Sequence, residues 1–241
     1  MGLQRGLRGQ DLNLRPSGYE PDELPDCSTP QAKYSGSVDA RQTDTADTAW
    51  IEVGVHSGVM KYCPNCASPL TLTVPPADNR PRYVCPSCSA IHYQNPRIVT
   101  GTVCTWDGRI LLCKRAIEPR YGYWTLPAGF MEIGETVADG AIRETTEEAG
   151  AKIELQDLYS MIDVIHAEQV HVFYRARMLD PALDPGPESL EARLFDEAEI
   201  PWDQLAFKTV IRTLRWFVSD RKEGRFGLHT DSIVHQPKAT G

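Results

Sequence analysis

Residues 129–151, GFMEIGETVADGAIRETTEEAGA, contain the pattern that decides the fold of this chain. Apolar and alanine positions recur with the period of an α-helix, so the stretch is predicted to be a loop leading into a helix that ends near Gly150. Glu144, Glu147 and Glu148 are spaced i, i+3 and i+4, which places their carboxylates on one helical face. Because three like charges on one patch repel each other, the patch is stable when a hard divalent cation binds to it.

The same stretch resembles the Nudix box, Gly-x5-Glu-x7-Arg-Glu-U-x-Glu-Glu-x-Gly-U, where U is a bulky aliphatic residue. Every invariant position of that pattern is present, and the two U positions hold the smaller residues Thr145 and Ala151. A solvated acidic helix face is the usual interpretation of a run of charges. The long pattern of fixed offsets favours a metal site instead. The fixed positions are Gly129, Glu135, Arg143, Glu144, Glu147, Glu148 and Gly150.

The segments around the box predict a mixed β-sheet. Residues 97–105 and 109–115 are typical of strands, and Asp107-Gly108 between them is typical of a tight hairpin turn. Strands followed by helices suit an α/β fold with helices on both faces of the sheet, and the resemblance implies the same Nudix α/β/α sandwich. Further strands are expected at 152–164, 170–178 and 192–195, and an amphipathic helix at 206–220 with Trp216 and Phe217 facing inward.

Two cysteine pairs precede the predicted sheet. Cys63-Pro-Asn-Cys66 and Cys85-Pro-Ser-Cys88 are separated by eighteen residues, which is the spacing of a four-cysteine zinc ribbon with a hairpin between its knuckles. Two matched pairs make a redox pair or coincidence a poor explanation. Because protein side chains fill all four ligand positions, the zinc is expected to be structural. His92 lies just beyond the second pair, either as a fifth candidate ligand or as a packing or surface histidine.

The ends of the chain suggest four parts. Residues 1–59 lack periodicity and are expected to be either disordered or translated from DNA upstream of the true start, which would then be Met60. Back-translation of residues 17–24 resembles the antisense of a bacterial initiator transfer RNA, which supports the second alternative. The expected boundaries are 1–59 for this extension, 60–95 for the zinc ribbon, 96–222 for the Nudix domain and 223–241 for a flexible tail.

Composition excludes several classes of protein. The chain has 241 residues and a formal net charge of −8, which argues against a broad nucleic-acid surface. The basic and aromatic side chains near the ribbon form only a thin patch, so nucleic acid is an unlikely partner. No apolar run reaches membrane-spanning length and no signal-peptide pattern opens the chain. The seven cysteines do not suggest a disulfide framework, so a cytoplasmic location is expected.

The Nudix resemblance implies metal-dependent hydrolysis of a nucleoside diphosphate linked to another group. Magnesium or manganese would be held by Glu144 and Glu148, with Glu147 as a third ligand and the Gly129 carbonyl as a further one. Arg143 is expected to orient a carboxylate of the box, together with Glu135. Tyr123 and Trp124, next to the box, could stack on a base or flavin ring, although core packing is as good an interpretation. The general base is expected in a downstream loop, with Glu168, Glu188 and Glu191 as candidates.

The phrases IHYQNPRIVTGTV, EPRYGYWTLPAGFMEIGE and EIPWDQLAF resemble the zinc-ribbon Nudix group that includes ADP-ribose and FAD pyrophosphatases. NADH pyrophosphatases carry a Ser-Gln-Pro-Trp-Pro-Phe-Pro run downstream of the box, and residues 161–177, MIDVIHAEQVHVFYRAR, lack it. ADP-ribose and FAD are therefore ranked above NADH. A regulator that only binds a nucleotide or nucleic acid is a second alternative, and a homodimer is compatible with the sequence.

Overall fold

The computed structural model of the protein describes residues 59–234. The expected extension falls outside this range apart from Val59, and so do residues 235–241. The N-terminal part of the described chain forms a three-stranded antiparallel sheet in the order β1-β2-β3. Its strands are β1 (Thr71–Thr73), β2 (Arg82–Val84) and β3 (Ile91–His92). The hairpin expected between the two cysteine pairs is therefore present.

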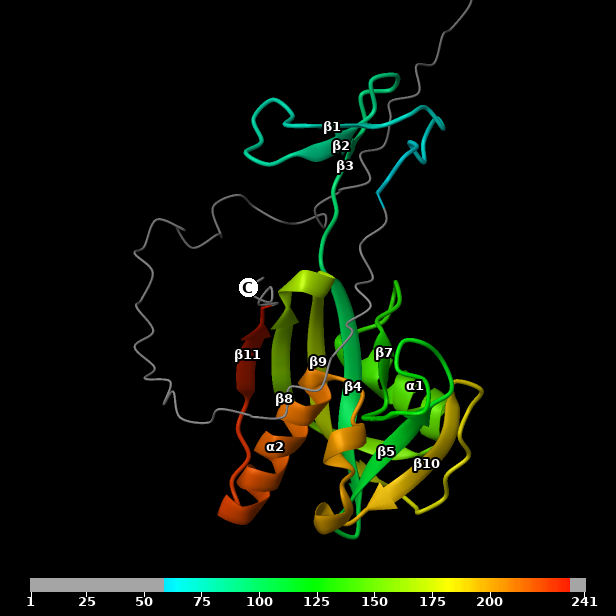
Figure 1. The fold of residues 1–241 in the computed structure, drawn as a ribbon, viewed down its shortest axis with the longest axis vertical. Helices are drawn as coiled ribbons and strands as arrows, with labels where there is room; N and C mark the ends of the chain where they lie inside the picture. The colour runs from blue at the N-terminus through cyan, green and yellow to red at the C-terminus, as the bar shows by residue number, and fades with distance from the viewer. Residues whose placement is uncertain (1–58, 235–241) are drawn as a thin grey trace, which may run out of the picture. The chain divides into compact units, whose positions relative to one another are not determined.

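The larger sheet has the strand order β10-β5-β4-β9-β8-β11, with β6 added to β5 and β7 added to β4. Figure 1 shows β11, β8, β9 and β4 side by side in this sheet. The β4/β9 and β11/β8 pairs are parallel and the other pairs are antiparallel, so the sheet is mixed, as predicted. The strands are β4 (Arg97–Trp106), β5 (Arg109–Arg115), β6 (Trp124–Thr125), β7 (Ala128–Phe130), β8 (Ile153–Val164), β9 (Gln169–Met178), β10 (Ser189–Phe195) and β11 (His229–Ile233).

Alternating side chains on the central strands build two apolar layers. On β4, Val103 belongs to a core with the second helix, α2 (Lys208–Glu223), whereas the next residue, Cys104, belongs to a core with the first helix, α1 (Val137–Ala149). Successive residues of a strand point to opposite faces of the sheet. The two helices therefore cover opposite faces, and the α/β/α sandwich is confirmed. Cys104 is fully buried, which agrees with a packing role.

Helix α1 begins and ends where its sequence signals place it. Thr136 caps the first turn in a capping box with Asp139, each side chain accepting a hydrogen bond from the other residue's backbone amide. Gly150 ends the helix in the left-handed conformation, with φ 65°. Elsewhere in residues 59–234, short 3₁₀ turns lie at Ile165–Ala167, Glu197–Glu199 and Trp202–Gln204.

The expectation of a flexible tail from residue 223 is wrong for residues 229–233. Strand β11 pairs with β8 in parallel over five residues, from His229 opposite Ser160 to Ile233 opposite Val164. A partly buried polar contact fixes its start, because His229 Nε2 lies 2.8 Å from the carboxylate of Asp220 on α2. Asp220 also accepts a hydrogen bond of 3.1 Å from the Tyr159 hydroxyl on β8. This network ties the C-terminal strand to helix α2 and to strand β8.

Within residues 59–234, no helix is long and apolar enough to cross a membrane.

Candidate active site and metal centres

The glutamates of α1 lie against the backbone of β7. Strand β7 pairs with β4, Gly129 lying opposite Thr100. A Cβ atom added to Gly129 would lie 2.4 Å from Oε2 of Glu144, which is closer than any real Cβ contact. Glycine at this position therefore lets a carboxylate of the helix approach the main chain of the strand.

Glu148 is the most buried carboxylate of the group. Glu148 is 6% exposed. Its Oε2 accepts a hydrogen bond of 3.2 Å from the amide of Ala128. Burial raises the pKa of Glu148 to about 8, and the nearby charge of Glu144 acts in the same direction. A buried carboxylate of this kind is stabilised when a cation is bound beside it.

Arg143 gathers three glutamates around one guanidinium group. It binds Glu135 in a bidentate manner, Nε to Oε2 at 3.0 Å and Nη2 to Oε1 at 2.8 Å. Its Nη1 also donates to Glu144 Oε1 at 2.7 Å and to Glu147 Oε2 at 3.0 Å. These hydrogen bonds from Arg143 hold the pKa of Glu135 at about 2. Arg143 thus stands between the loop that opens the box and the glutamate face of the helix.

A second segment, residues 184–188, packs against the C-terminal end of α1, which carries the same glutamates. The amide of Asp184 donates to the carbonyl of Ala149 at 2.9 Å. A Cβ atom on Gly186 would lie 2.1 Å from the carbonyl oxygen of Glu147, so only glycine fits. Burial is the main cause that raises the pKa of both Glu144 and Glu148, and the charge of Glu188, at the end of this segment, acts in the same direction. Of the three residues predicted as general base, Glu188 therefore lies within electrostatic reach of the box.

The balance of charge in the cluster fits a divalent cation. Burial lowers the pKa of Arg115 on β5, while the charges of Glu148 and Glu188 act in the opposite direction, so this arginine faces the glutamates too. Carboxylate oxygens in excess of positive charge are the ligands that magnesium and manganese prefer. The cluster consists of five carboxylates, on Glu135, Glu144, Glu147, Glu148 and Glu188, and two guanidinium groups, on Arg115 and Arg143.

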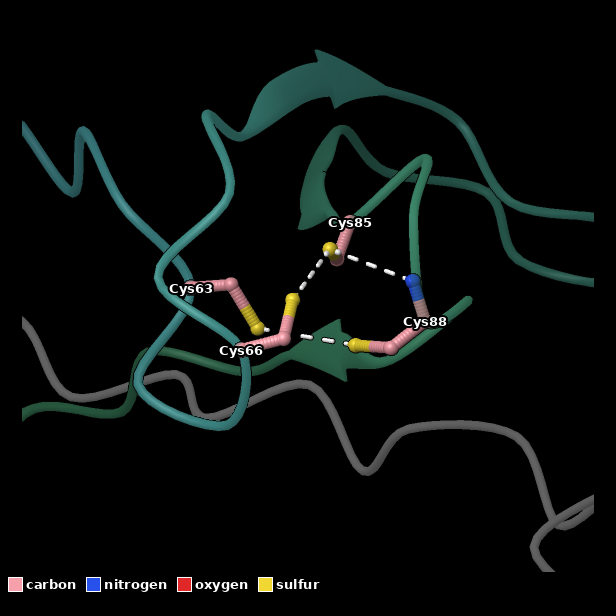
Figure 2. A group of neighbouring side chains, drawn as sticks. All are labelled: Cys63, Cys66, Cys85 and Cys88. Atoms are coloured by element: carbon pink, nitrogen blue, oxygen red, sulfur yellow. Dashed lines mark hydrogen bonds between the residues drawn. The ribbon is translucent and has the colours of Figure 1, made fainter.

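The two cysteine pairs form knuckles of the same backbone design. In the first, the amide of Cys63 donates to Ser68 O at 2.8 Å, and the second repeats this bond from Cys85 to Ala90 O at 2.9 Å. The residue four positions after the first cysteine of each pair, Ala67 or Ser89, is left-handed, with φ 58° or 59°. Each knuckle thereby curls so that its two sulfurs face the other pair (Figure 2).

The four sulfurs are spaced for one tetrahedral ion. Those of Cys63, Cys66, Cys85 and Cys88 all lie within 4.8 Å of one another. Cys63 and Cys88 are 3.6 Å apart and Cys66 and Cys85 are 3.4 Å apart. Zn–S bonds of about 2.3 Å separate tetrahedral sulfurs by about 3.8 Å. The residues present therefore fit a four-cysteine zinc site.

Comparison with protein-family models agrees with both sites. The model described as the NUDIX domain matches residues 95–217, more than half of the chain. The chain belongs to the Nudix family. A second model, described as Nudix N-terminal and named for a zinc ribbon, matches residues 61–94. The box, the ribbon and the sandwich expected from the sequence are thereby confirmed.

Two relatives are similar over more than half of this chain. A crystal structure of a NUDIX hydrolase from Nitrosomonas europaea is similar at 46% identity and a TM-score of 0.70, covering 72% of this chain and 99% of that one. The ADP-ribose pyrophosphatase of Methanocaldococcus jannaschii is 34% identical over 133 residues, covering 52% of this chain and 76% of the relative. The intact box and these relatives identify the chain as a pyrophosphohydrolase of the Nudix family.

A third relative has a more specific name. The NAD-capped RNA hydrolase NudC of Chromobacterium violaceum is 39% identical over 94 residues, which is 39% of this chain and 33% of the relative. The similarity therefore spans only a third of that protein.

The aromatic residues expected to contact substrate have different environments. Trp124 is 5% exposed and packs edge-to-face against Phe195 at 4.8 Å between ring centroids, so its ring belongs to the core. Tyr123 is partly buried, with the guanidinium of Arg120 over its ring at 5.2 Å. Tyr121 in the same loop is exposed. Of the three positions in this segment expected to contact substrate or metal, Tyr123 and Gly129 are therefore less buried than Trp124.

Two residues at the site were not among those predicted. Phe130 follows Gly129 directly, is 46% exposed, and has the guanidinium of Arg97 over its ring at 4.7 Å. Its carbonyl accepts a hydrogen bond of 3.1 Å from Arg143. Arg115 ends strand β5 and acts on Glu148 and Glu188 through its charge. The position of Phe130 beside the box glycine was a usable signal, whereas nothing in the local sequence distinguished Arg115.

Proposed function

We propose that the protein hydrolyses the diphosphate bridge of a nucleoside diphosphate linked to a bulky second group, with magnesium as the metal and ADP-ribose or FAD as the substrate. The observation that carries the proposal is the contact of Glu148 and Glu144 with the backbone of Ala128 and Gly129. That contact places two carboxylate groups of the helix side by side against the backbone of β7. A bound divalent ion there would neutralise the diphosphate and lower the pKa of a water molecule.

The roles of the glutamates follow from their surroundings. Glu148, buried and without an arginine hydrogen bond in the described structure, is the strongest metal ligand, with Glu144 second. Glu147 is the most exposed of the three and shares Arg143, so it is a third and more peripheral ligand. Glu135 and Arg143 position this set, because Arg143 bridges Glu135 to both Glu144 and Glu147.

We infer that Glu188 is the general base, because its charge acts on both Glu144 and Glu148. A carboxylate at this place can accept the proton of an attacking water. Glu191 instead pairs with Lys114 in the β10/β5 ladder, and Glu168 ends the short turn before β9. Neither is among the groups that act on Glu144 or Glu148.

The name of the Methanocaldococcus relative supports ADP-ribose. The exposed rings of Phe130 and Tyr121 and the partly buried Tyr123 offer surfaces for a planar ring, as FAD or an adenine base would require. A zinc ion on the four cysteines would stabilise the ribbon, whose small sheet buries little apolar surface of its own. A cytoplasmic location agrees with this zinc site, because cysteines are kept reduced in the cytoplasm and so remain able to bind a metal.

The relatives named NAD-capped RNA hydrolase favour a second candidate, hydrolysis of a nicotinamide dinucleotide, free or at the end of an RNA. The Nudix domain lacks the Ser-Gln-Pro-Trp-Pro-Phe-Pro run, which ranks this candidate lower. A regulator that only binds nucleotide is ranked lower still, because all four carboxylates of the box are intact.

A substrate panel tests these alternatives. Purified protein with magnesium, and separately with manganese, would be given ADP-ribose, FAD, NADH, diadenosine polyphosphates and a NAD-capped RNA, with released AMP or uncapped RNA measured. We expect AMP from ADP-ribose or FAD with the highest kcat/KM. NADH or capped RNA as the best substrate would replace the first candidate by the second. Binding without turnover of any of them would support the regulator. The Glu148→Gln protein serves as the control for contaminating hydrolases.

A further inference from the structure

His92 touches the cysteine cluster without being one of its four sulfur ligands. It lies on β3, in register with Tyr83 on β2. Its Nε2 is 3.3 Å from the sulfur of Cys63, within hydrogen-bond distance for sulfur. Cys63 is 2% exposed, so this contact is on the buried side of the cluster.

The other three sulfurs already have hydrogen-bond donors from their own knuckles. The amide of Cys88 lies 3.4 Å from the sulfur of Cys85 (Figure 2). Ser68 hydrogen-bonds to the thiol of Cys66 through its side chain and its backbone. The backbone of Ala90 hydrogen-bonds to Cys88. Cys63 is the cysteine whose donor comes from a side chain outside both knuckles.

The chemistry of a zinc tetrathiolate explains why such donors matter. Four thiolates around Zn²⁺ leave two net negative charges in a small volume, and N–H or O–H donors to the sulfurs offset part of that charge. The two knuckles repeat each other, and the position equivalent to His92, seven residues after the first cysteine, is Leu70 in the first knuckle. The backbone of the knuckle therefore does not require a histidine at this position, because the first knuckle has the same backbone hydrogen bonds with Leu70 there.

We propose that His92 is a hydrogen-bond donor to the Cys63 thiolate that strengthens zinc binding by the ribbon, and that it is not itself a ligand. The proposal rests on the zinc site proposed above. In this arrangement the Nε2–H group of His92 donates to the sulfur of Cys63. Four sulfurs already complete a tetrahedral set, so the imidazole acts from outside the coordination sphere.

Zinc affinity of the full chain is the test. Zinc would first be counted in wild-type protein by elemental analysis, and then measured by competition with a chromophoric chelator for wild type, His92→Phe and His92→Gln. Phe keeps a ring of similar size but removes the N–H, whereas Gln keeps an N–H donor. Tyr93→Phe, at the exposed neighbouring position, controls for general effects on the hairpin.

We expect His92→Phe to bind zinc about 10- to 100-fold more weakly, the usual effect of losing such a donor, with Gln recovering part of the loss and Tyr93→Phe unchanged. Equal affinity of His92→Phe and wild type would overturn the proposal, as would equal losses in Phe and Gln. Absence of zinc from wild type would instead overturn the zinc site itself.

Cobalt(II) substitution separates a donor from a ligand. The intensity of the thiolate-to-cobalt charge-transfer bands reports the number of thiolates, and the d–d bands report a change from four sulfurs to three sulfurs and one nitrogen. We expect the same spectrum for wild type and His92→Phe. A spectrum that changes on removing the imidazole would show that His92 is a ligand, and would overturn the assignment.

Discussion

Gly129 and Glu144 meet where the helix of the Nudix box crosses strand β7, and a methyl group on the glycine would lie 2.4 Å from the glutamate carboxylate. The two residues are fifteen positions apart and belong to different elements. Glu144 can therefore take this position only because residue 129 has no side chain. The fixed glycine and glutamate of the box form a single contact.

We expect Gly129→Ala to lower kcat/KM by about 10²-fold while the protein stays folded, because a displacement of about 1 Å at a catalytic group has an effect of that size. Steady-state kinetics with ADP-ribose and far-UV circular dichroism would measure this. Gly227→Ala, where an added Cβ atom would meet no other atom within 4 Å, is the matched control for a glycine-to-alanine change. Near-wild-type turnover of Gly129→Ala would mean that Glu144 can move without loss.

Glu148→Gln should abolish nearly all hydrolysis. Gln keeps the shape and the hydrogen bond from Ala128 but loses the charge that holds the metal. A metal ion supplies several kcal/mol of transition-state stabilisation, so a fall of about 10²-fold or more is expected. The uncharged side chain also removes the free-energy cost of burying a carboxylate. In magnesium-free buffer, the variant should therefore unfold at the same urea concentration as wild type or at a higher one. Turnover at saturating magnesium close to that of wild type would refute the role of Glu148.

Much of the fold follows from local signals. Asp107 and Gly108 both have positive φ, 46° and 77°, as the hairpin turn predicted from their residue types requires. Residues 97–105 and 109–115 form β4 and β5 within one residue of their expected limits. The capping box and Gly150 likewise place α1. These elements were predictable because each carries its own signal in consecutive residues.

The elements that sequence reasoning missed depend on distant contacts. Strand β11 has the polar sequence HTDSI and forms because β8 offers a free edge and Asp220 binds His229. The position of Glu188 depends on Gly186 fitting against the carbonyl of Glu147. Neither contact produces a period or a motif in the sequence. The tertiary structure alone brings these residues together.

A buried pair of hydroxyl groups fixes α1 on the sheet. Thr145 holds a box position where a bulky aliphatic residue is usual, and its Oγ1 donates to Ala141 O at 2.7 Å. The Thr102 hydroxyl on β4 lies 2.8 Å from the same Oγ1. Because Thr145 uses its proton on Ala141, Thr102 must be the donor of this second bond. Loss of the Thr145 hydroxyl would therefore leave the Thr102 hydroxyl without this acceptor, whereas loss of the Thr102 hydroxyl would leave the bond from Thr145 to Ala141 in place.

Thr145→Val should destabilise the protein by about 1–3 kcal/mol, because it leaves the buried Thr102 hydroxyl without this acceptor. Thr102→Val should cost less, about 0.5–1.5 kcal/mol, because Thr145 keeps its bond to Ala141. The double variant should cost less than the two single changes together. Urea unfolding of the four proteins at one pH gives this double-mutant cycle. An equal or larger cost for Thr102→Val would contradict the direction of the hydrogen bond.

His171 makes the stability of the sheet depend on acidity. Its Nε2 lies 2.9 Å from Gln169 Oε1, and its Nδ1 lies 3.1 Å from the Thr209 hydroxyl of α2, so the neutral ring is satisfied at both nitrogens. Burial lowers the pKa of His171 to about 4. An unfolded histidine titrates near its ordinary pKa of about 6.5. Between these two values the unfolded chain binds a proton that the folded protein does not.

The stability of wild type should therefore fall as the pH is lowered from about 6.5 to about 4, by at most about 1.4 kcal/mol per pH unit from this residue. His171→Gln removes the titration, so the difference in unfolding free energy between the two proteins should be constant above pH 7 and should shift in favour of the variant below pH 6.5. The carboxylates titrate in both proteins and cancel from the difference. Urea unfolding at pH 8, 7, 6 and 5 in magnesium-free buffer measures it. A difference that stays constant down to pH 5 would mean that folded His171 takes up its proton as readily as the unfolded chain does.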